Sequence, residues 1–263
     1  MKLIQQLKPR IVLLLSLASL ATGCATTQTA DPSDPWESWN RPMQTFNDHV
    51  DDYVMKPVAR GYRWITPAFV DKGISNFFGN LTDIRVVLND VLQGKFAQSA
   101  SDGARLLVNT TAGVGGFIDV ASEIDLPRHN EDFDQTLGVW GIPTGPYLVL
   151  PLIGPSSPRG VLGLAGDIAA NPISYTGVYF AAASTSTIVS SSLGATHAID
   201  LRADNIEVVR IAREAAIDRY AFFRAAYLSQ RRYLVSDGNI ADDDVLLHLD
   251  YFDEHDMAPV KPY

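Results

Sequence analysis

The sequence has a single cysteine, only five histidines and a shortage of positive charge. One cysteine excludes an intramolecular disulfide framework and a zinc site built from several cysteines. Acidic residues outnumber Lys and Arg by 30 to 21, and the pI is about 4.9. This balance argues against a nucleic-acid partner, because phosphate binding needs a cationic surface. The mean hydropathy of +0.03 is too low for a bundle of membrane spans, whereas 46% hydrophobic residues is too high for a disordered chain.

The N-terminus has the pattern of a secretory signal. Three basic residues precede an apolar run over residues 11–21, which is long enough for a signal but too short to span a bilayer. Small residues then lead into Cys24. An ordinary signal with a chance cysteine is the alternative. We favour a bacterial lipobox, in which residues 1–23 are a signal peptide and Cys24 is the acylated first residue of the mature chain, although Ala21 stands where Leu is common.

The mature chain needs its lipid to stay at a membrane. Cleavage after residue 23 removes three positive charges and no negative ones, so anionic headgroups repel what remains. Acyl chains such as palmitate can hold it, because each buried CH₂ contributes about 0.8 kcal/mol. Residue 25 is Ala rather than Asp, which by resemblance to lipoprotein sorting favours the outer membrane of a Gram-negative bacterium over the inner one.

Apolar residues at alternating spacings of three and four predict helices. Asp34 is expected to be the N-cap of the first helix, and Pro42 predicts a bend or a division into two short helices. Gly94 is expected to end the second helix. No segment combines alternating hydrophobicity with hairpin turn signals, so we expect a mainly α fold. The predicted helices cover about 36–53, 73–92, 97–109 and 203–235.

The chain divides into four parts. Residues 1–23 are the signal peptide, 24–33 a flexible lipidated tether, and 34–235 a helical domain. Residues 236–263 carry eight acids and one lysine, which is typical of a mobile solvated tail. The apolar residues 245–247 leave a docking segment as the alternative.

Residues 135–199 contain only two formal charges, those of Arg159 and Asp167. Nine Gly and Pro residues fall within 138–158, so a straight spanning helix cannot be built there. Two interpretations remain open. The segment is a buried core with Gly- and Pro-rich loops, or it sits in lipid without crossing it, as broken helices and a re-entrant loop. In lipid, Arg159 and Asp167 would be functional candidates.

The sequence carries no motif that indicates catalysis. The run 154–158 fails the nucleophile-elbow pattern, and the glycines at 113–116 lack the spacing of a phosphate loop. The five histidines form no metal-binding pair of the His-Glu-x-x-His type. We therefore predict neither an enzyme nor a cofactor or metal site.

Several sequence blocks follow one another in order through residues 34–232. The most specific are Asp34-Pro35-Trp36-Glu37-Ser38-Trp39-Asn40-Arg41, Gln135-Thr136-Leu137-Gly138, Gly145-Pro146-Tyr147-Leu148-Val149-Leu150-Pro151 and Gly154-Pro155. These blocks resemble the MlaA (VacJ) family of outer-membrane lipoproteins. Two positions depart from the family pattern: Asp134, where Gly is usual, and Gly160, where an acid is common. These departures affect the local loop and ion-pair geometry.

The resemblance implies intermembrane phospholipid transport. Family members form a ring of helices in the inner leaflet of the outer membrane, around an amphipathic channel and next to a porin trimer. They remove phospholipids misplaced in the outer leaflet and pass them to the periplasmic carrier MlaC, and on to an ATP-driven complex. Two alternatives remain: a porin-associated structural lipoprotein without transport activity and, more weakly, a lipid hydrolase.

The resemblance also suggests channel or gate residues. Phe46 and Asn47 match the region that affects the gate, with plain packing as the alternative. Arg159 and Asp167 are candidates to face the channel, with a buried ion pair or a rim position as the alternative. Three residues of the Gly145–Pro151 block are candidates for its hydrophobic wall, with ordinary core as the alternative: Tyr147, Leu148 and Leu150.

Overall fold

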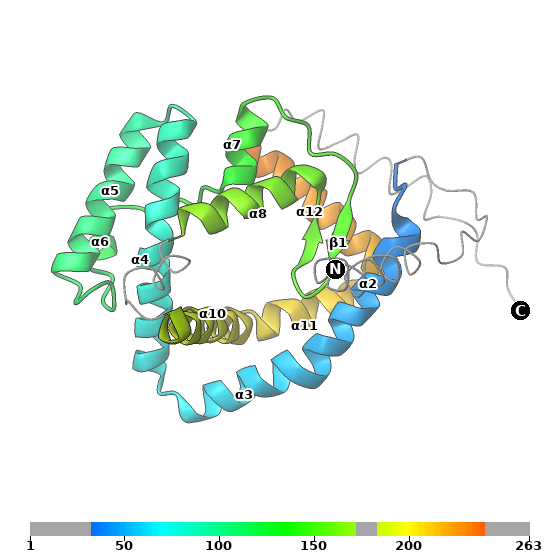
Figure 1. Ribbon diagram of the computed structural model, residues 1–263, viewed down its shortest axis with the longest axis horizontal. Coiled ribbons are helices and arrows are strands. Elements are labelled where there is room, and N and C mark those ends of the chain that lie inside the picture. The colour runs from blue at the N-terminus through cyan, green and yellow to red at the C-terminus, as the bar shows by residue number, and fades with distance from the viewer. Residues whose placement is uncertain (1–32, 172–182, 240–263) are drawn as a thin grey trace, which may run out of the picture.

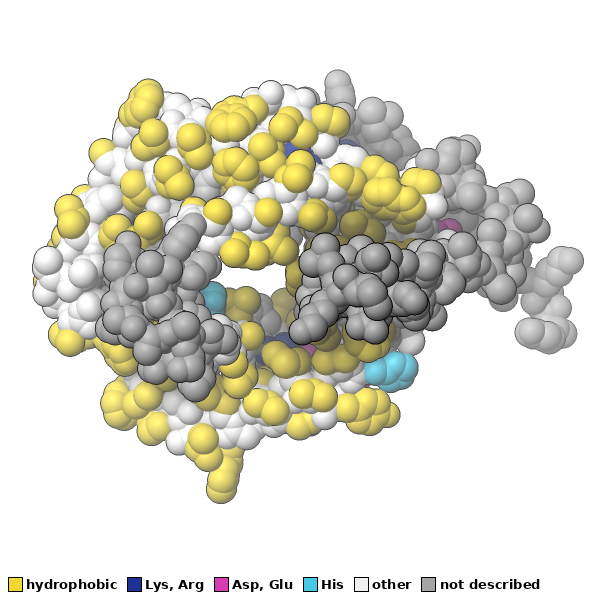
Figure 2. Space-filling view, viewed as in Figure 1, with side chains coloured by type: hydrophobic (Ala, Val, Ile, Leu, Met, Phe, Trp, Pro, Cys, Tyr) yellow, Lys and Arg dark blue, Asp and Glu magenta, His cyan; other side chains and the backbone are white. Residues whose placement is uncertain are grey.

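The computed structural model describes residues 33–171 and 183–239. The predicted signal peptide, Cys24, the tether up to residue 32 and the acidic tail from residue 240 lie outside these ranges. The described chain is mainly helical, which confirms the predicted fold class. Its elements follow one another around a central gap between the ribbons (Figure 1). The space-filling view shows that an opening remains there between the side chains (Figure 2).

The elements include one short hairpin that the sequence did not predict. Strands β1 and β2 pair in antiparallel register, with Val149 opposite Pro155. In chain order the described elements are α2 (Glu37–Val50), the π-helix η1 (Asp51–Met55), α3 (Lys56–Ile65), α4 (Ala68–Leu92), α5 (Phe96–Thr111), α6 (Val120–Glu123), α7 (Phe133–Val139), β1 (Leu148–Leu150), β2 (Gly154–Ser156), α8 (Pro158–Ala170), α10 (Ala183–Asp204), α11 (Ile206–Ala215) and α12 (Arg219–Val235).

Helix α2 begins later than predicted and is not divided at Pro42. Its N-cap is Trp36, and no side chain caps it. The predicted cap, Asp34, is buried instead, and its carboxylate accepts a hydrogen bond from the Tyr220 hydroxyl. The α-geometry changes only at η1, and α2, η1 and α3 together form one long curved rod (Figure 1). Contacts of α2 on both sides of Pro42 offset the one backbone bond that proline removes.

Helices α4 and α5 lie where the periodicity placed them. Gly94 directly follows the C-cap residue of α4 and has a φ of 78°, so the expected glycine ends this helix in the left-handed conformation. The Lys95 amide closes the turn by donating to the Asp90 carbonyl at 2.8 Å. These two helices pack side by side and form one wall of the molecule (Figure 1).

The single long helix predicted over 203–235 is wrong. The structure has three helices here, because α10 ends at Asp204, α11 begins after its N-cap Asn205, and the chain is extended at Ala216. The Asp218 carboxylate then caps α12 by accepting from the amides of Tyr220 at 2.8 Å and Ala221 at 3.2 Å. The three- and four-residue spacing continues through both breaks, so periodicity alone could not reveal them.

The distribution of polar and apolar residues is the reverse of that in a water-soluble domain. Among the described residues, 18 polar or charged side chains are buried but only 10 hydrophobic ones, while 32 large hydrophobic side chains are exposed. On α4, Asp83 and Asp90 are buried, whereas Leu88 is 45% exposed. Hydrophobic side chains cover much of the face in Figure 2. No helix in the described ranges is long and apolar enough to cross a membrane.

Candidate functional site: two adjoining cavities beside the hairpin

The hairpin is held on its free edge by side chains of α2 rather than by a third strand. Asn40 is fully buried, and its side chain acts as both donor and acceptor. Its amide N–H donates to the Tyr147 carbonyl at 2.9 Å, and its amide oxygen accepts from the Val149 backbone N–H at 2.8 Å. The Trp39 indole donates to the Val149 carbonyl at 3.1 Å. Pro155 lies opposite Val149, at a position where the β-ladder requires no backbone N–H donor, so the missing N–H of proline is tolerated there.

Asn47, two helical turns after Asn40, holds the tip of the hairpin. Its amide donates to the Leu150 carbonyl at 2.8 Å, and its oxygen accepts from the Leu152 amide at 2.7 Å. Leu152 has a φ of 65°, a conformation that non-glycine residues rarely adopt, so this tip depends on its outside partners. Phe46 is nearly half exposed. Of the two predicted gate residues, Asn47 therefore has a structural connection to the hairpin.

The three predicted wall residues lie in different environments. Tyr147 is buried and packs edge-on against Tyr220, which fits the core alternative, yet its hydroxyl has no hydrogen-bond partner among the described residues. Burial raises the pKa of Tyr147 well above its usual value. Leu148 and Leu150, on either side of Val149, are half-buried.

A cavity of about 170 Å³ lies between α2, the hairpin and helices α11 and α12. It brings together Asn47 and Tyr147, two residues singled out by the sequence. Among the described residues that line it, only Asp48 and Arg213 are charged, and most of the others are apolar. The remaining lining residues are Gln44, Val149, Gly154, Pro155, Val209 and Phe223.

A second cavity of about 420 Å³ adjoins the first and shares Asn47, Asp48, Gly154 and Arg213 with it. It lies between η1, the hairpin tip and α10. Figure 2 shows few charged side chains on the visible face, some of them at the edge of the central opening. Apart from the shared residues, the lining consists of Val50, Asp51, Met55, Leu152, Ile153, Ala198, Leu201, Arg202 and Asn205.

Charged residues on one wall of these cavities form ion pairs between distant parts of the chain. Arg202 pairs with Asp51 through Nε at 2.5 Å and Nη2 at 2.9 Å. Arg213 reaches Asp48 at 2.8 Å and Asp51 at 3.0 Å. Burial alone would raise the pKa of Asp51, but the bond from Arg202 brings it below its usual value. For Asp48 burial outweighs the attraction of Arg213, and its pKa is raised.

Comparisons with known proteins identify the family to which the chain belongs. The sequence model described as "MlaA lipoprotein" matches residues 32–234 of the chain. The chain belongs to the MlaA lipoprotein family. An "Intermembrane phospholipid transport system lipoprotein MlaA" of Haemophilus influenzae is 30% identical over 260 residues, covering 93% of this chain and all of that protein.

Two further comparisons support the same family assignment. The protein of the same name in Escherichia coli is 32% identical over 228 residues, covering 84% of this chain and 87% of that protein. A solved structure described as "Structural basis for maintenance of bacterial outer membrane lipid asymmetry" superimposes with a TM-score of 0.66 at 31% identity. It covers 77% of this chain and 99% of that one.

In this MlaA family member, Arg159 and Asp167 do not line either cavity. Arg159 is 5% exposed and pairs with Asp134 at 2.6 Å, as the ion-pair alternative predicted. Asp134, the departure from the family pattern, therefore supplies the partner of this arginine. Asp167 pairs with Arg85 at 3.2 Å and accepts from the Phe133 amide at 3.0 Å. Both residues tie helices together and are not brought to Asn47 and Tyr147.

Sequence reasoning missed the roles of Asn40, Arg202 and Arg213. One signal was present: Asp51 and Asp52 follow Asp48 by three and four residues, so both lie near it on a helix face that needs a cationic partner. The partner arginines lie about 150 residues later in the chain, so only the folded structure identifies them.

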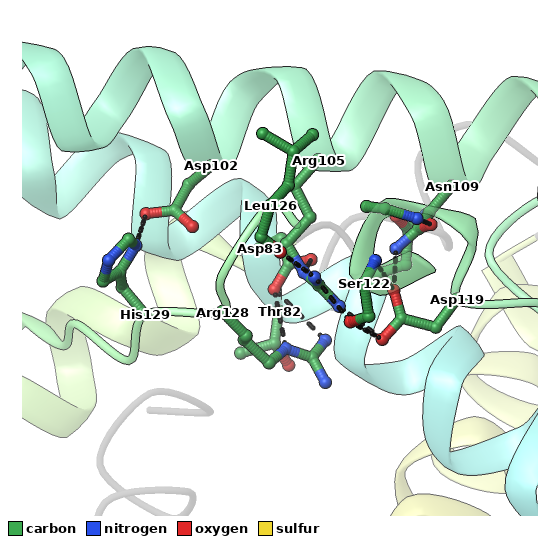
Figure 3. A network of polar contacts seen from close by, with 12 residues as sticks. Thr82, Asp83, Asp102, Arg105, Asn109, Asp119, Ser122, Leu126, Arg128 and His129 are labelled. Carbon is green, nitrogen blue, oxygen red and sulfur yellow. Dashed lines mark hydrogen bonds and ion pairs between the residues drawn. The ribbon is translucent and has the colours of Figure 1, made fainter. Parts of the chain in front are cut away.

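A polar network elsewhere in the MlaA fold has a structural role. Arg105 on α5 is 1% exposed and contacts Asp119 at 2.5 Å, the Ser122 hydroxyl at 3.0 Å and the Leu126 carbonyl at 2.8 Å (Figure 3). Burial alone would raise the pKa of Asp119, but hydrogen bonds from Ser122, Asn109 and Arg105 bring it below its usual value. The network holds α6 and the following loop on α5. No group of three His, Cys, Asp or Glu in the described ranges is arranged to hold a metal ion.

Proposed function

We propose that this chain is an outer-membrane lipoprotein of an intermembrane phospholipid transport system. It takes phospholipids misplaced in the outer leaflet, conducts them through an amphipathic passage and passes them to the periplasmic carrier MlaC, so that lipid asymmetry is maintained. Membership of the MlaA family and the names of the relatives support this function.

The observation that carries the proposal is the pair of adjoining cavities, charged on one wall and apolar on the others. A phospholipid headgroup resists transfer into hydrocarbon, and its tails resist water. A passage that offers both surfaces lowers both free-energy costs at once. No bond is made or broken, so the family needs no catalytic residue. A passive passage only equilibrates lipid, so the energy for net transport comes from other components.

The proposed location is the inner leaflet of the outer membrane. Acyl chains on Cys24 anchor the chain there, and the helices form a ring-like bundle embedded in lipid without a conventional transmembrane span. The exposed hydrophobic surface supports this placement, because so many apolar side chains in water would drive aggregation. Part of the same surface contacts an outer-membrane porin trimer.

The function is tested by deleting the gene in its host. Phosphatidylethanolamine in the outer leaflet is measured on intact cells with a membrane-impermeant amine reagent, and complementation with the wild-type gene is the control. We expect outer-leaflet phospholipid to rise on deletion and to return on complementation. If asymmetry is unchanged while porin assembly is altered, the structural alternative is correct and the transport proposal is wrong.

The embedding is tested separately from the anchor. Residues 1–24 are replaced by a cleavable signal without cysteine, and the secreted product is extracted with and without non-ionic detergent. We expect the product to stay with membranes and to need detergent, because its apolar exterior remains. A monomer that is soluble without detergent would contradict the embedded arrangement.

A further inference from the structure

Three cations at one corner of the molecule have no partner within the described chain. Arg60 and Arg63 lie on α3, and Lys72 lies near the start of α4. All three are exposed, and none makes a hydrogen bond or an ion pair with the described residues. Each of the other described Lys and Arg side chains reaches at least one protein acceptor. In a chain where acids outnumber bases by 30 to 21, this corner is therefore unusual.

The exposed side chains of α3 are sorted around its axis. Arg60 and Arg63 are three residues apart and share one flank. Trp64 follows Arg60 by four residues, so it lies beside this flank, and it is 87% exposed. Val58 and Ile65, seven residues apart, share the other flank and are exposed as well. Around the exposed face, α3 therefore passes from positive charge through an aromatic ring to aliphatic side chains.

The inner side of α3 is covered by the rest of the protein. Ala59 is fully buried in a cluster with Ala203 and Ile206, and Tyr62 packs against the same cluster. Helix α10 contacts α3 on this side, and α3 forms the lower edge of the molecule in Figure 1. Hydrophobic side chains project from that edge in Figure 2. The sorted face of α3 is therefore the face that meets the surroundings.

The acids that contact this part of the fold face the inner side of α3. Asp200 accepts from the Tyr62 hydroxyl at 3.0 Å, and Asp204 lies one turn further along α10. Burial raises the pKa of Tyr62, and Asp71 adds to this effect from the same side. Tyr62 lies on the side of α3 opposite Trp64, so the thickness of a helix, about 10 Å, separates these acids from the arginines. That distance exceeds the screening length of about 8 Å at physiological ionic strength, so the acids leave the corner positive.

The order of side chains around α3 matches the order of environments at the edge of a lipid leaflet. Arginine favours phosphate groups, tryptophan favours the boundary below them, and aliphatic side chains favour hydrocarbon. Tyr53 and Phe69, which precede and follow α3, are also strongly exposed and extend the aromatic row. An acidic protein partner would supply the opposite charge, but it would not require this order. The pattern therefore favours an anionic lipid surface.

We propose that α3 is an interfacial helix whose arginines, Arg60 and Arg63, bind the phosphate groups of anionic phospholipids in the leaflet around the protein. Trp64 lies at the headgroup boundary, and the flank that carries Val58 lies among the acyl chains. This inference rests on the proposed function, to which it adds one helix and one class of lipid for the leaflet contact. It gives the chain an electrostatic attachment that does not depend on the lipid of Cys24, although the chain as a whole is acidic.

The test uses Trp64 as a reporter in the full chain, reconstituted into phosphatidylcholine vesicles. Brominated acyl chains quench tryptophan on contact, so brominated phosphatidylglycerol and brominated phosphatidylcholine are compared at equal mole fraction. The Trp64 signal is the difference between each protein and the same protein with Trp64→Phe. The charge variant is Arg60→Gln/Arg63→Gln. The matched control, Arg210→Gln/Arg232→Gln, removes two exposed charges of the same sign from α11 and α12.

In the wild type we expect a preference for phosphatidylglycerol at Trp64 of about fivefold or more, because each basic residue near an anionic surface contributes about that factor. The preference should fall to about one in Arg60→Gln/Arg63→Gln and should weaken in the wild type at high salt. The control variant should keep it. The contact is refuted if the wild type shows no preference, or if both variants lose it equally. Quenching by neither lipid would show that α3 faces protein or water, and it would also refute the contact.

The same data separate this inference from the proposed function. If brominated phosphatidylcholine quenches Trp64 and phosphatidylglycerol is not preferred, the embedded arrangement stands and the anionic-lipid contact is wrong. If deletion of the gene does not raise outer-leaflet phospholipid, the transport function fails. The quenching ratios then decide the lipid contact of α3 on their own.

Discussion

At the scale of single residues, the site depends on amide side chains that replace a missing strand. Asn40 and Asn47 lie two turns apart on α2, so both point to the same edge of the hairpin. Each one bonds a backbone donor and a backbone acceptor there. The two asparagines therefore fix β1, the preceding residue Tyr147, and the hairpin tip that lines the larger cavity.

Replacing Asn40 tests this dependence. Asn40→Ala leaves the Val149 amide and the Tyr147 carbonyl buried without partners, so the free energy of unfolding should fall by about 2–4 kcal/mol. Denaturant unfolding in non-ionic detergent measures the loss. Asn76→Ala is the control, because Asn76 makes one hydrogen bond at an exposed position, and it should lose about 1 kcal/mol or less. Equal losses for the two variants would contradict the role of Asn40.

The raised pKa of Asp90 predicts how the free energy of unfolding depends on pH. It is fully buried, and burial together with the charge of Asp102 raises its pKa to about 7. The unfolded chain releases this proton near pH 4, whereas the folded chain keeps it until about pH 7. The folded state binds more protons in that window, so Asp90 lowers stability as pH rises from about 4 to 7.

Asp90→Asn should remove this loss, because the amide stays neutral at every pH. The variant should be more stable than the wild type at pH 8, by about 1 kcal/mol or more, and the difference should shrink toward pH 4. Unfolding midpoints across this range test the prediction, with the exposed Glu123→Gln as control. A difference that does not vary with pH would show that Asp90 does not hold its proton in the folded state.

At the scale of elements, α7 and α8 pack so closely that glycine is required. A Cβ on Gly163 would lie 2.6 Å from the Asp134 backbone nitrogen, and backbone cannot move aside cheaply. Gly61, within α3, has no atom within 4 Å of the same position. A methyl group is therefore sterically excluded at Gly163 but accommodated at Gly61.

Gly163→Ala should lower the free energy of unfolding by about 1–3 kcal/mol, because the methyl group overpacks the helix contact. Gly61→Ala should raise it by about 0.5–1 kcal/mol, because alanine favours the helix and meets nothing. Urea unfolding of both variants provides the measurement. If both substitutions stabilise the protein, α7 and α8 are not packed as closely as described.

The sequence predicted the elements that local rules determine and missed those set by distant contacts. The α4–α5 pair was predictable because apolar spacing and Gly94 agree. The hairpin was not predictable, because the backbone groups along its edge form hydrogen bonds with Asn40 and Asn47 of α2, which lie about 100 residues earlier in the sequence. The candidate site was also predictable only in part. The family resemblance indicated Asn47 and Tyr147. The charged wall was not predictable, because Asp51 pairs with Arg202, which lies far away in the sequence.

At the scale of the whole molecule, the described chain buries more polar than hydrophobic side chains and exposes many large hydrophobic ones. Buried groups such as Arg105 and Asp134 are retained because each finds charged or hydrogen-bonding partners. The described first part of the charge-poor stretch, residues 135–171, does not form a conventional apolar core, since α7, α8 and the hairpin expose Val139, Leu152 and Ile168. This distribution suits a protein whose surroundings are partly hydrocarbon.

The measurement that tests the central claim most directly is photocrosslinking of lipid inside the larger cavity in living cells. A photoreactive amino acid replaces Leu201 on the cavity wall or, as control, the exposed Glu207, whose carboxylate pairs with Arg210. Adducts are identified by mass spectrometry after purification. We predict phospholipid adducts at Leu201 and none at Glu207. A folded, membrane-localised protein without phospholipid at Leu201, or with equal amounts at both positions, would contradict the account.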